Sequence, residues 1–147
     1  MFKHILVPVD GSQLSDSTVD RAISFASETG AKITFFFAKP EYPLAFYGEG
    51  ALIDPRTPEQ FANMAEQQAQ LLLNAATAKA DAAGVMASGL SSASDAPWSG
   101  IIAAANETGA DLIFMASHGR RGISGLLLGS ETQKVLTHSK IPVLVYR

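Results

Sequence analysis

The chain has 147 residues, which fits one domain over residues 1–147 with a sizeable core that needs no crosslinks. It contains no cysteine, so disulfides, a thiolate nucleophile and a cysteine-based metal site are excluded. With 11 basic and 14 acidic residues the formal net charge is -3, which gives no electrostatic reason to expect nucleic acid as a partner. No apolar run approaches the roughly 20 residues that span a bilayer or forms a signal-peptide core. We therefore expect a cytoplasmic protein that is not inserted in a membrane.

The first part of the chain alternates short β-rich runs with helical periodicity. Residues 4–9 (HILVPV) predict a buried strand that ends in the turn Asp10-Gly11-Ser12. A helix follows, with Ser15 as its candidate N-cap and Gly30 as its stop. The residues that share its apolar face are Val19, Ala22, Ile23 and Ala26. Residues 31–38 (AKITFFFA) predict a second buried strand.

Residues 39–58 lose this periodicity and are rich in proline, which predicts a long irregular loop. Its aromatic residues Tyr42, Phe46 and Tyr47 fit a loop folded on its own core, a ligand lid or an oligomer contact. A long helix then begins at Thr57, runs to about Ala83 and stops at Gly84. Gln60 completes a capping box with Thr57. The expected core stripe of this helix consists of Phe61, Ala65, Leu72 and Ala76.

The rest of the chain repeats the strand–helix alternation. Residues 85–93 (VMASGLSSA) predict a strand, residues 110–117 (ADLIFMAS) another, and residues 141–147 (IPVLVYR) a fifth. Between them we expect a helix from Asp95-Ala96-Pro97 to Gly109 and a short helix with a capping box of Ser130 and Gln133. The expected buried face of the first of these helices consists of Trp98, Ile101, Ile102 and Ala105. Five strands separated by helices predict an α/β fold, with an open, mostly parallel five-stranded sheet and helices on both faces in a Rossmann-like three-layer sandwich.

Two turns of such a sheet are candidate ligand sites, because ligands bind beyond the carboxyl ends of the strands where the strand order reverses. They are Pro8 to Ser12 and the glycine-rich stretch Ala116 to Ser130, within MASHGRRGISGLLLGS. Glycines allow close approach of the backbone, and Gly129-Ser130 leads into a helix N-terminus that favours an anion such as phosphate. A purely structural turn fits the glycine spacing equally well.

Four segments in this order resemble the universal stress protein family of the single-domain type. They are HILVPVDGS, ADLIFMASHGRRG, LLLGSETQKVL and IPVLVYR, and the resemblance covers essentially the whole chain. Nucleotide-binding members of that family carry a loop of the form G-x2-G-x9-G-[S/T], which cradles the ATP phosphates and the ribose. Here Gly119, Gly129 and Ser130 match the pattern, and Ala116 stands at the first glycine.

The resemblance implies a stress-response protein that binds an adenine nucleotide, with ATP favoured over ADP or AMP, together with Mg²⁺. It implies that Asp10 accepts hydrogen bonds from the ribose and that Ala38 and Met115 flank the base. The implied nucleotide-binding residues are Pro8, Val9, Asp10, Ala38, Met115, Ala116, His118, Gly119, Arg120, Gly129, Ser130 and Glu131. It also implies a homodimer through the last strand, Pro142 to Tyr146, whose apolar edge the sequence leaves without a following element.

Other functions compete with this interpretation. Ser117 next to His118 raises a hydrolase, but the bulky Met115 does not suit a nucleophile elbow. A dinucleotide site lacks its glycine pattern after the first strand, and a receiver domain lacks its paired acids. The histidines show no metal-ligand spacing, and no catalytic base is identifiable, although weak ATP hydrolysis fits such proteins. The open alternative is a nucleotide-independent protein that acts through protein partners and uses the glycine loop structurally. A Gly129→Val variant is expected to abolish nucleotide binding and to leave the fold largely intact.

Overall fold

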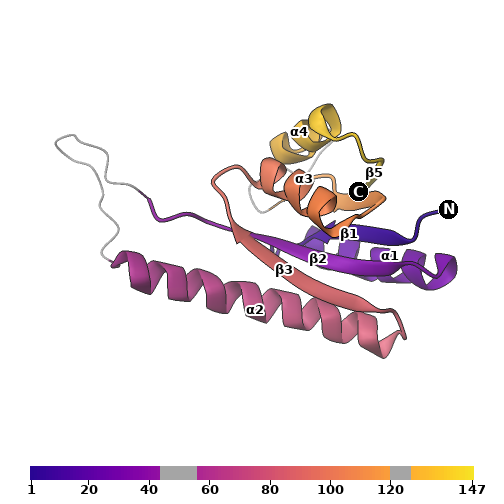
Figure 1. Cartoon of the computed structure of the whole chain (residues 1–147), viewed down its shortest axis with the longest axis horizontal. Helices are drawn as coiled ribbons and strands as arrows, with labels where there is room; N and C mark the ends of the chain where they lie inside the picture. Colours follow the sequence, from indigo (N-terminus) through magenta and orange to yellow (C-terminus); the bar gives the residue numbers. More distant parts are fainter. Residues whose placement is uncertain (44–55, 120–126) are drawn as a thin grey trace.

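A computed structural model describes residues 1–43, 56–119 and 127–147 of the chain. Within these residues five parallel strands form one sheet in the order β3-β2-β1-β4-β5 (Figure 1). The strands are β1 (His4–Pro8), β2 (Lys32–Lys39), β3 (Ala87–Ala93), β4 (Leu112–Ala116) and β5 (Val143–Tyr146). The predicted open, parallel five-stranded sheet is confirmed.

Helices cover both faces of the sheet, also as predicted (Figure 1). They are α1 (Gln13–Thr29), α2 (Pro58–Ala82), α3 (Pro97–Thr108) and α4 (Ser130–His138). Apolar residues of α1 and α2 share one core cluster with the sheet, and those of α3 and α4 share the other. Consecutive residues of a strand pack into opposite clusters, because side chains alternate between the two faces of the sheet along a strand. Phe35 is 0% exposed in the first cluster and Phe36 is 1% exposed in the second, and each contributes about 2–3 kcal/mol by burial.

Helix α1 begins about one helical turn earlier than predicted. Ser12, not Ser15, is the N-cap, and its Oγ accepts a hydrogen bond of 3.1 Å from the Ser15 backbone N–H. Both serines can cap a helix, but Gly11 adopts a φ of 78° and lets the chain turn directly after the strand. The predicted stop at Gly30 is confirmed, with a left-handed φ of 72°.

The capping box that opens α2 is confirmed. Thr57 Oγ1 accepts from the Gln60 N–H at 3.1 Å, and Gln60 Oε1 accepts from the Thr57 N–H at 3.0 Å. The core face of α2 is rotated slightly from the prediction, because Leu73 is buried and Leu72 and Phe61 are half-buried. The buried residues of this helix are Ala65, Ala69, Leu73, Ala76 and Ala80.

Helix α3 begins at Pro97 and is followed by Gly109, as predicted, and Ile101 and Ala105 are buried. Trp98 and Ile102 were expected in the core but are half-buried, because Ala104 and Gly100 occupy the face toward the sheet.

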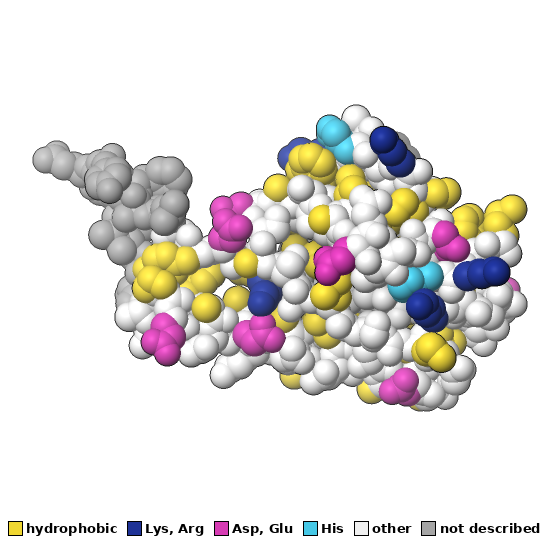
Figure 2. All heavy atoms as spheres, viewed as in Figure 1, with side chains coloured by type: hydrophobic (Ala, Val, Ile, Leu, Met, Phe, Trp, Pro, Cys, Tyr) yellow, Lys and Arg dark blue, Asp and Glu magenta, His cyan; other side chains and the backbone are white. Residues whose placement is uncertain are grey.

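The aromatic segment before α2 is held at its two described ends. Tyr42 packs edge-on against Phe61 with ring centroids 5.6 Å apart, and its hydroxyl donates to the Arg56 carbonyl at 2.9 Å. The Arg56 guanidinium lies over the Phe61 ring at 5.0 Å and reaches the Met64 sulfur. Figure 2 shows hydrophobic side chains gathered at this end of α2. These contacts join Tyr42 to Arg56 and Phe61, while Phe46 and Tyr47 lie outside the described residues.

The amino end of the sheet carries a buried polar group. His4 is 7% exposed, and its Nε2 lies 2.8 Å from Thr34 Oγ1. Burial lowers the pKa of His4, and the nearby Lys32 lowers it further, against the opposing field of Asp111. Asp111 accepts hydrogen bonds from the backbone N–H groups of Lys3 and His4, and these outweigh its burial and lower the pKa of Asp111.

Candidate functional site at the carboxyl edge of strands β1 and β4

The site lies where the strand order reverses. Strand β1 pairs with β2 on one side and with β4 on the other. The connection after β1 therefore runs toward β2, and the connection after β4 runs the opposite way, toward β5. The loops after these two strands meet at one edge, which is the usual ligand position in open parallel sheets. The two turns singled out in the sequence are therefore neighbours in space.

The turn after β1 is fixed by a chain of short hydrogen bonds. Asp10 Oδ1 accepts from the Ser12 N–H at 2.9 Å, and the Asp10 N–H donates to Ser15 Oγ at 3.1 Å. Asp10 thus serves as a turn former, as aspartate before glycine often does. The same bonds set the direction of its carboxylate, whose Oδ2 faces the loop after β4.

Gly119 brings the two loops together. A Cβ built on Gly119 would lie 2.5 Å from Asp10 Oδ2, closer than any real side chain tolerates. The absence of a side chain at Gly119 therefore allows the β4 loop to approach the Asp10 carboxylate. Residues 120–126 of this loop, with Arg120, Arg121, Gly122 and Gly125, lie outside the described residues.

The far end of the loop is clamped onto the end of β4. The Gly129 N–H donates to the Ser117 carbonyl at 2.7 Å, and Thr132 Oγ1 donates to the Ala116 carbonyl at 3.0 Å. A Cβ on Gly129 would lie 3.0 Å from His118 Cα and 3.2 Å from the Ser117 carbonyl oxygen, so a side chain here would push against the backbone at the end of β4. The Gly129→Val variant would consequently shift the turn at His118 locally, and the expectation that it leaves the fold largely intact stays a prediction.

The N-terminus of α4 differs from the predicted capping box. Gly129 is the N-cap, Ser130 is the first helical residue, and no side chain of the described residues caps the helix. The helix thus starts one residue earlier than predicted, and the Gln133 side chain does not complete a capping box but donates from Nε2 to the Leu128 carbonyl at 2.8 Å. The first N–H groups of a helix lack helical partners, and the helix dipole is positive at this end. Ser130, the first residue of this turn, is exposed.

The residues implied for the adenosine line the same edge on three adjacent strands. Pro8 ends β1, and the buried Val9 follows with its N–H donating to the Phe36 carbonyl at 2.8 Å. Ala38 lies near the end of β2 and Met115 near the end of β4, on the two sides of β1. Both belong to the core cluster beneath α3, Ala38 at its half-buried margin and Met115 at 5% exposure.

Glu131 and His118 have partners within the protein. Glu131 Oε2 accepts from the Trp98 N–H at 2.8 Å and so caps α3, whose own N-cap residue offers no side-chain hydrogen bond. His118 is half-buried, with its Nδ1 3.3 Å from Ser117 Oγ. Ser117 itself is 4% exposed, which withholds its hydroxyl from a substrate.

Sequence reasoning missed the structural roles of Thr132, Ser117 and Glu131. The side chain of Thr132 ties α4 to the end of β4, and the buried Ser117 provides the carbonyl that Gly129 needs. A threonine two residues into a helix gives no signal of such a contact, because its partner lies 16 positions away.

Neither a metal cluster nor a membrane span is found in the described part of the chain. Residues 1–43, 56–119 and 127–147 contain no group of three or more His, Asp or Glu side chains arranged to hold a metal ion. Within these ranges, no helix has both the length and the apolar character that crossing a membrane requires.

Comparison with known proteins identifies the family that this chain matches. Residues 1–147 match the universal stress protein family. The chain is 30% identical over 151 residues to universal stress protein YxiE of Bacillus subtilis, and the match covers 100% of both chains. The solved structure of protein MJ0577 of Methanocaldococcus jannaschii superposes with a TM-score of 0.81 at 23% identity, covering 99% of this chain and 95% of that one. A universal stress protein solved in complex with cAMP superposes with a TM-score of 0.72 at 27% identity, covering 99% and 97%.

Proposed function

Because the chain belongs to the universal stress protein family, we propose that it binds an adenine nucleotide at the carboxyl edge of β1 and β4 and acts as a nucleotide-linked sensor or regulator. The observation that carries the proposal is the meeting of Asp10 and Gly119 at the point where the strand order reverses. The relative in complex with cAMP supports an adenine nucleotide as the ligand class. ATP is the favoured ligand, with ADP or AMP as alternatives.

The phosphates would bind at the start of α4. Among the described residues, the N-cap Gly129 provides no side-chain cap, and the exposed Ser130 adds a hydroxyl to the first-turn N–H groups, which lack partners within the helix. An uncapped N-terminus offers an anion both hydrogen bonds and a favourable dipole. These donors fit phosphate oxygens, and Mg²⁺ would then be held chiefly by the phosphates themselves. Arg120 and His118 are the proposed flanking groups of this subsite.

The adenosine would lie across the ends of β1, β2 and β4. Asp10 would accept hydrogen bonds from the ribose hydroxyls, since its carboxylate already points toward the β4 loop. Pro8 and Val9 would line the approach, and Ala38 and Met115 would flank the base from the strands on either side. The small Ala116 and Gly119 would leave room for the sugar. Glu131 would contribute indirectly, because its hydrogen bond to the Trp98 N–H holds α3 against α4.

A nucleotide-independent function is the second candidate, and specific contacts favour it. Ala116 replaces the first glycine of the family's loop pattern. Gly119 and Gly129 are each explained by close packing within the protein, against Asp10 and His118 respectively. Under this alternative the loop is structural and the protein acts through protein partners.

We also propose a homodimer that pairs through Pro142 to Tyr146, in a cytoplasmic protein. Strand β5 is an edge of the sheet, bonded to β4 alone among the described strands. Its four residues VLVY are half-buried, so a second copy could pair with this apolar edge.

Isothermal titration of nucleotide-stripped protein with ATP and Mg²⁺ tests the main proposal, with GTP as the control ligand. We expect saturable, adenine-selective binding in the micromolar range, which corresponds to roughly 8 kcal/mol. The Asp10→Asn variant should weaken binding, whereas Asp16→Asn, at an exposed position of α1, should not. Absence of heat together with an unchanged melting temperature would reject nucleotide binding and favour the second candidate.

A further inference from the structure

The second edge of the sheet is an unprotected strand. Strand β3 (ASGLSSA) bonds to β2 on one side, and no described strand pairs with its other side. Natural edge strands are usually protected by lysine, proline or a bulge, because an open edge invites pairing with another chain. The seven residues of β3 include no proline and no charged side chain. The edge therefore remains able to accept another strand.

The hydrogen-bond pattern shows which backbone groups are available. The Ile33 N–H donates to the Met86 carbonyl at 2.9 Å, and the Ser94 N–H donates to the Lys39 carbonyl at 2.9 Å. Even-numbered residues of this strand thus direct their backbone groups toward β2, as alternation in a parallel ladder requires. The backbone groups of the odd-numbered residues point away from the sheet, and these are Ala87, Gly89, Ser91 and Ala93.

The strand is nearly palindromic about Leu90. We infer that β3 pairs antiparallel with β3 of a second copy around a two-fold axis at Leu90, which joins the two sheets. In that register Ala87 faces Ala93 of the other copy, Ser88 faces Ser92, and Gly89 faces Ser91. The odd-numbered residues meet as hydrogen-bonded pairs, and Leu90 meets Leu90 as a non-hydrogen-bonded pair. Every facing pair consists of small or matching uncharged side chains, and facing serines can hydrogen-bond across the strands.

Helix α2 is placed to take part in this contact. It packs over both β2 and β3, since Leu73 joins the cluster of Phe35 and Phe37 and a Cβ on Gly89 would lie 3.1 Å from Leu73 Cβ. Two such helices on one continuous sheet would lie about two strand spacings, or ~10 Å, apart. That separation is an ordinary packing distance for helices.

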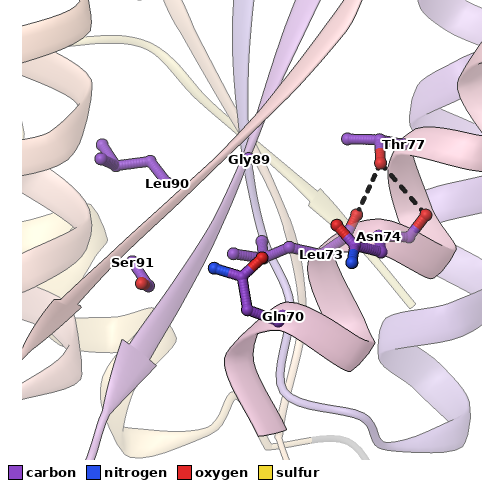
Figure 3. Close-up of a pocket in the computed structure, with 7 residues that line it drawn as sticks. All are labelled: Gln70, Leu73, Asn74, Thr77, Gly89, Leu90 and Ser91. Atoms are coloured by element: carbon purple, nitrogen blue, oxygen red, sulfur yellow. Dashed lines mark hydrogen bonds between the residues drawn. The ribbon is translucent and has the colours of Figure 1, made fainter. Parts of the chain in front are cut away.

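A groove beside β3 would be closed by the second copy. It has a volume of about 390 Å³ and is lined by Gln70, Leu73, Asn74, Thr77, Gly89, Leu90 and Ser91 (Figure 3). Figure 3 shows Gln70 and Asn74 of α2 beside the strand at Gly89. The side chains that line this groove are uncharged, so the same residues of a second copy can approach it without charge repulsion. This contact is separate from the proposed β5 dimer and would extend assembly beyond it.

A disulfide test reads the two-fold axis directly, because the chain has no cysteine of its own. In a non-hydrogen-bonded antiparallel pair the Cα atoms lie about 4.5 Å apart, within disulfide range. Leu90→Cys should therefore crosslink two full-length chains under mild oxidation. The matched control is Ser92→Cys, which is more exposed but would lie about 13 Å from its copy in this register. We expect several-fold more crosslinked dimer from Leu90→Cys, and equal or lower yield than from Ser92→Cys would overturn the register.

A charge test covers the case in which Leu90→Cys does not fold. The double variant Ser88→Lys/Ser92→Lys places like charges opposite each other and should lower the mean mass in sedimentation over a concentration series. The variant Ser88→Glu/Ser92→Lys places opposite charges in the same positions and should restore the wild-type mass. If both double variants behave alike, or if neither changes the mass, β3 does not pair with its own copy.

Discussion

Gly119→Ala perturbs the contact that joins the two halves of the proposed site. The added methyl would lie 2.5 Å from Asp10 Oδ2, about 0.9 Å short of the 3.4 Å at which ordinary contact begins. Asp10 cannot turn away freely, because its Oδ1 accepts from the Ser12 N–H at 2.9 Å in the turn that starts α1. Either this bond breaks or the β4 loop moves. We expect a loss of about 1–2 kcal/mol in the free energy of unfolding.

A double-mutant cycle with Asp10→Ala isolates the clash. Without the carboxylate the methyl of Gly119→Ala has room, so its cost should fall to within ~0.5 kcal/mol of zero. The difference, about 1 kcal/mol or more, is the coupling between the two loops. Urea unfolding of the wild type, the two single variants and the double variant measures all four corners. An undiminished cost of Gly119→Ala in the Asp10→Ala background would refute the apposition of Asp10 and Gly119.

Three further predictions concern stability. The lowered pKa of His4 disfavours its protonated form in the fold, so stability present above the ordinary pKa of about 6.5 should be lost as the pH falls below that value. His4→Gln should flatten this dependence in unfolding experiments at pH 7.5 and pH 5.5. Thr57→Ala removes one half of the capping box and should cost about 1 kcal/mol in urea unfolding, and a cost indistinguishable from zero would show that the α2 start does not depend on it. Glu131→Ala leaves the Trp98 N–H without its acceptor and should lower the free energy of unfolding by about 1–2 kcal/mol. The fluorescence emission of Trp98, the single tryptophan, should change as well. Unchanged emission and stability would contradict the capping of α3 by Glu131.

The sheet and the helix positions could be predicted because their signals are local. Buried runs such as HILVPV and the glycine stops at Gly30 and Gly109 act within one turn or strand. Where two residues offered the same local signal, the sequence could not choose between them. Ser12 and Ser15 are both able to cap α1, and the left-handed Gly11 decides in favour of Ser12.

The candidate site was predictable in position but not in its contacts. The carboxyl ends of β1 and β4 follow from the strand order, and the glycines of the loop mark a close approach. What each glycine approaches depends on distant residues, as with Gly129 against His118 or Gly119 against Asp10. Glu131 shows the same limit, since its partner Trp98 lies 33 positions away.

Titration of the isotopically labelled protein with ATP and Mg²⁺, followed through backbone amide resonances, tests the proposed nucleotide site most directly. We predict saturable shifts of the amides of Gly129, Ser130 and Glu131 at the start of α4 and of Asp10 and Gly119 at the facing loops. Gly30 and Gly84, which lie away from this edge after α1 and α2, should not shift. Shifts confined to the groove between α2 and β3, or no shifts at millimolar ATP, would contradict a nucleotide site between β1 and β4.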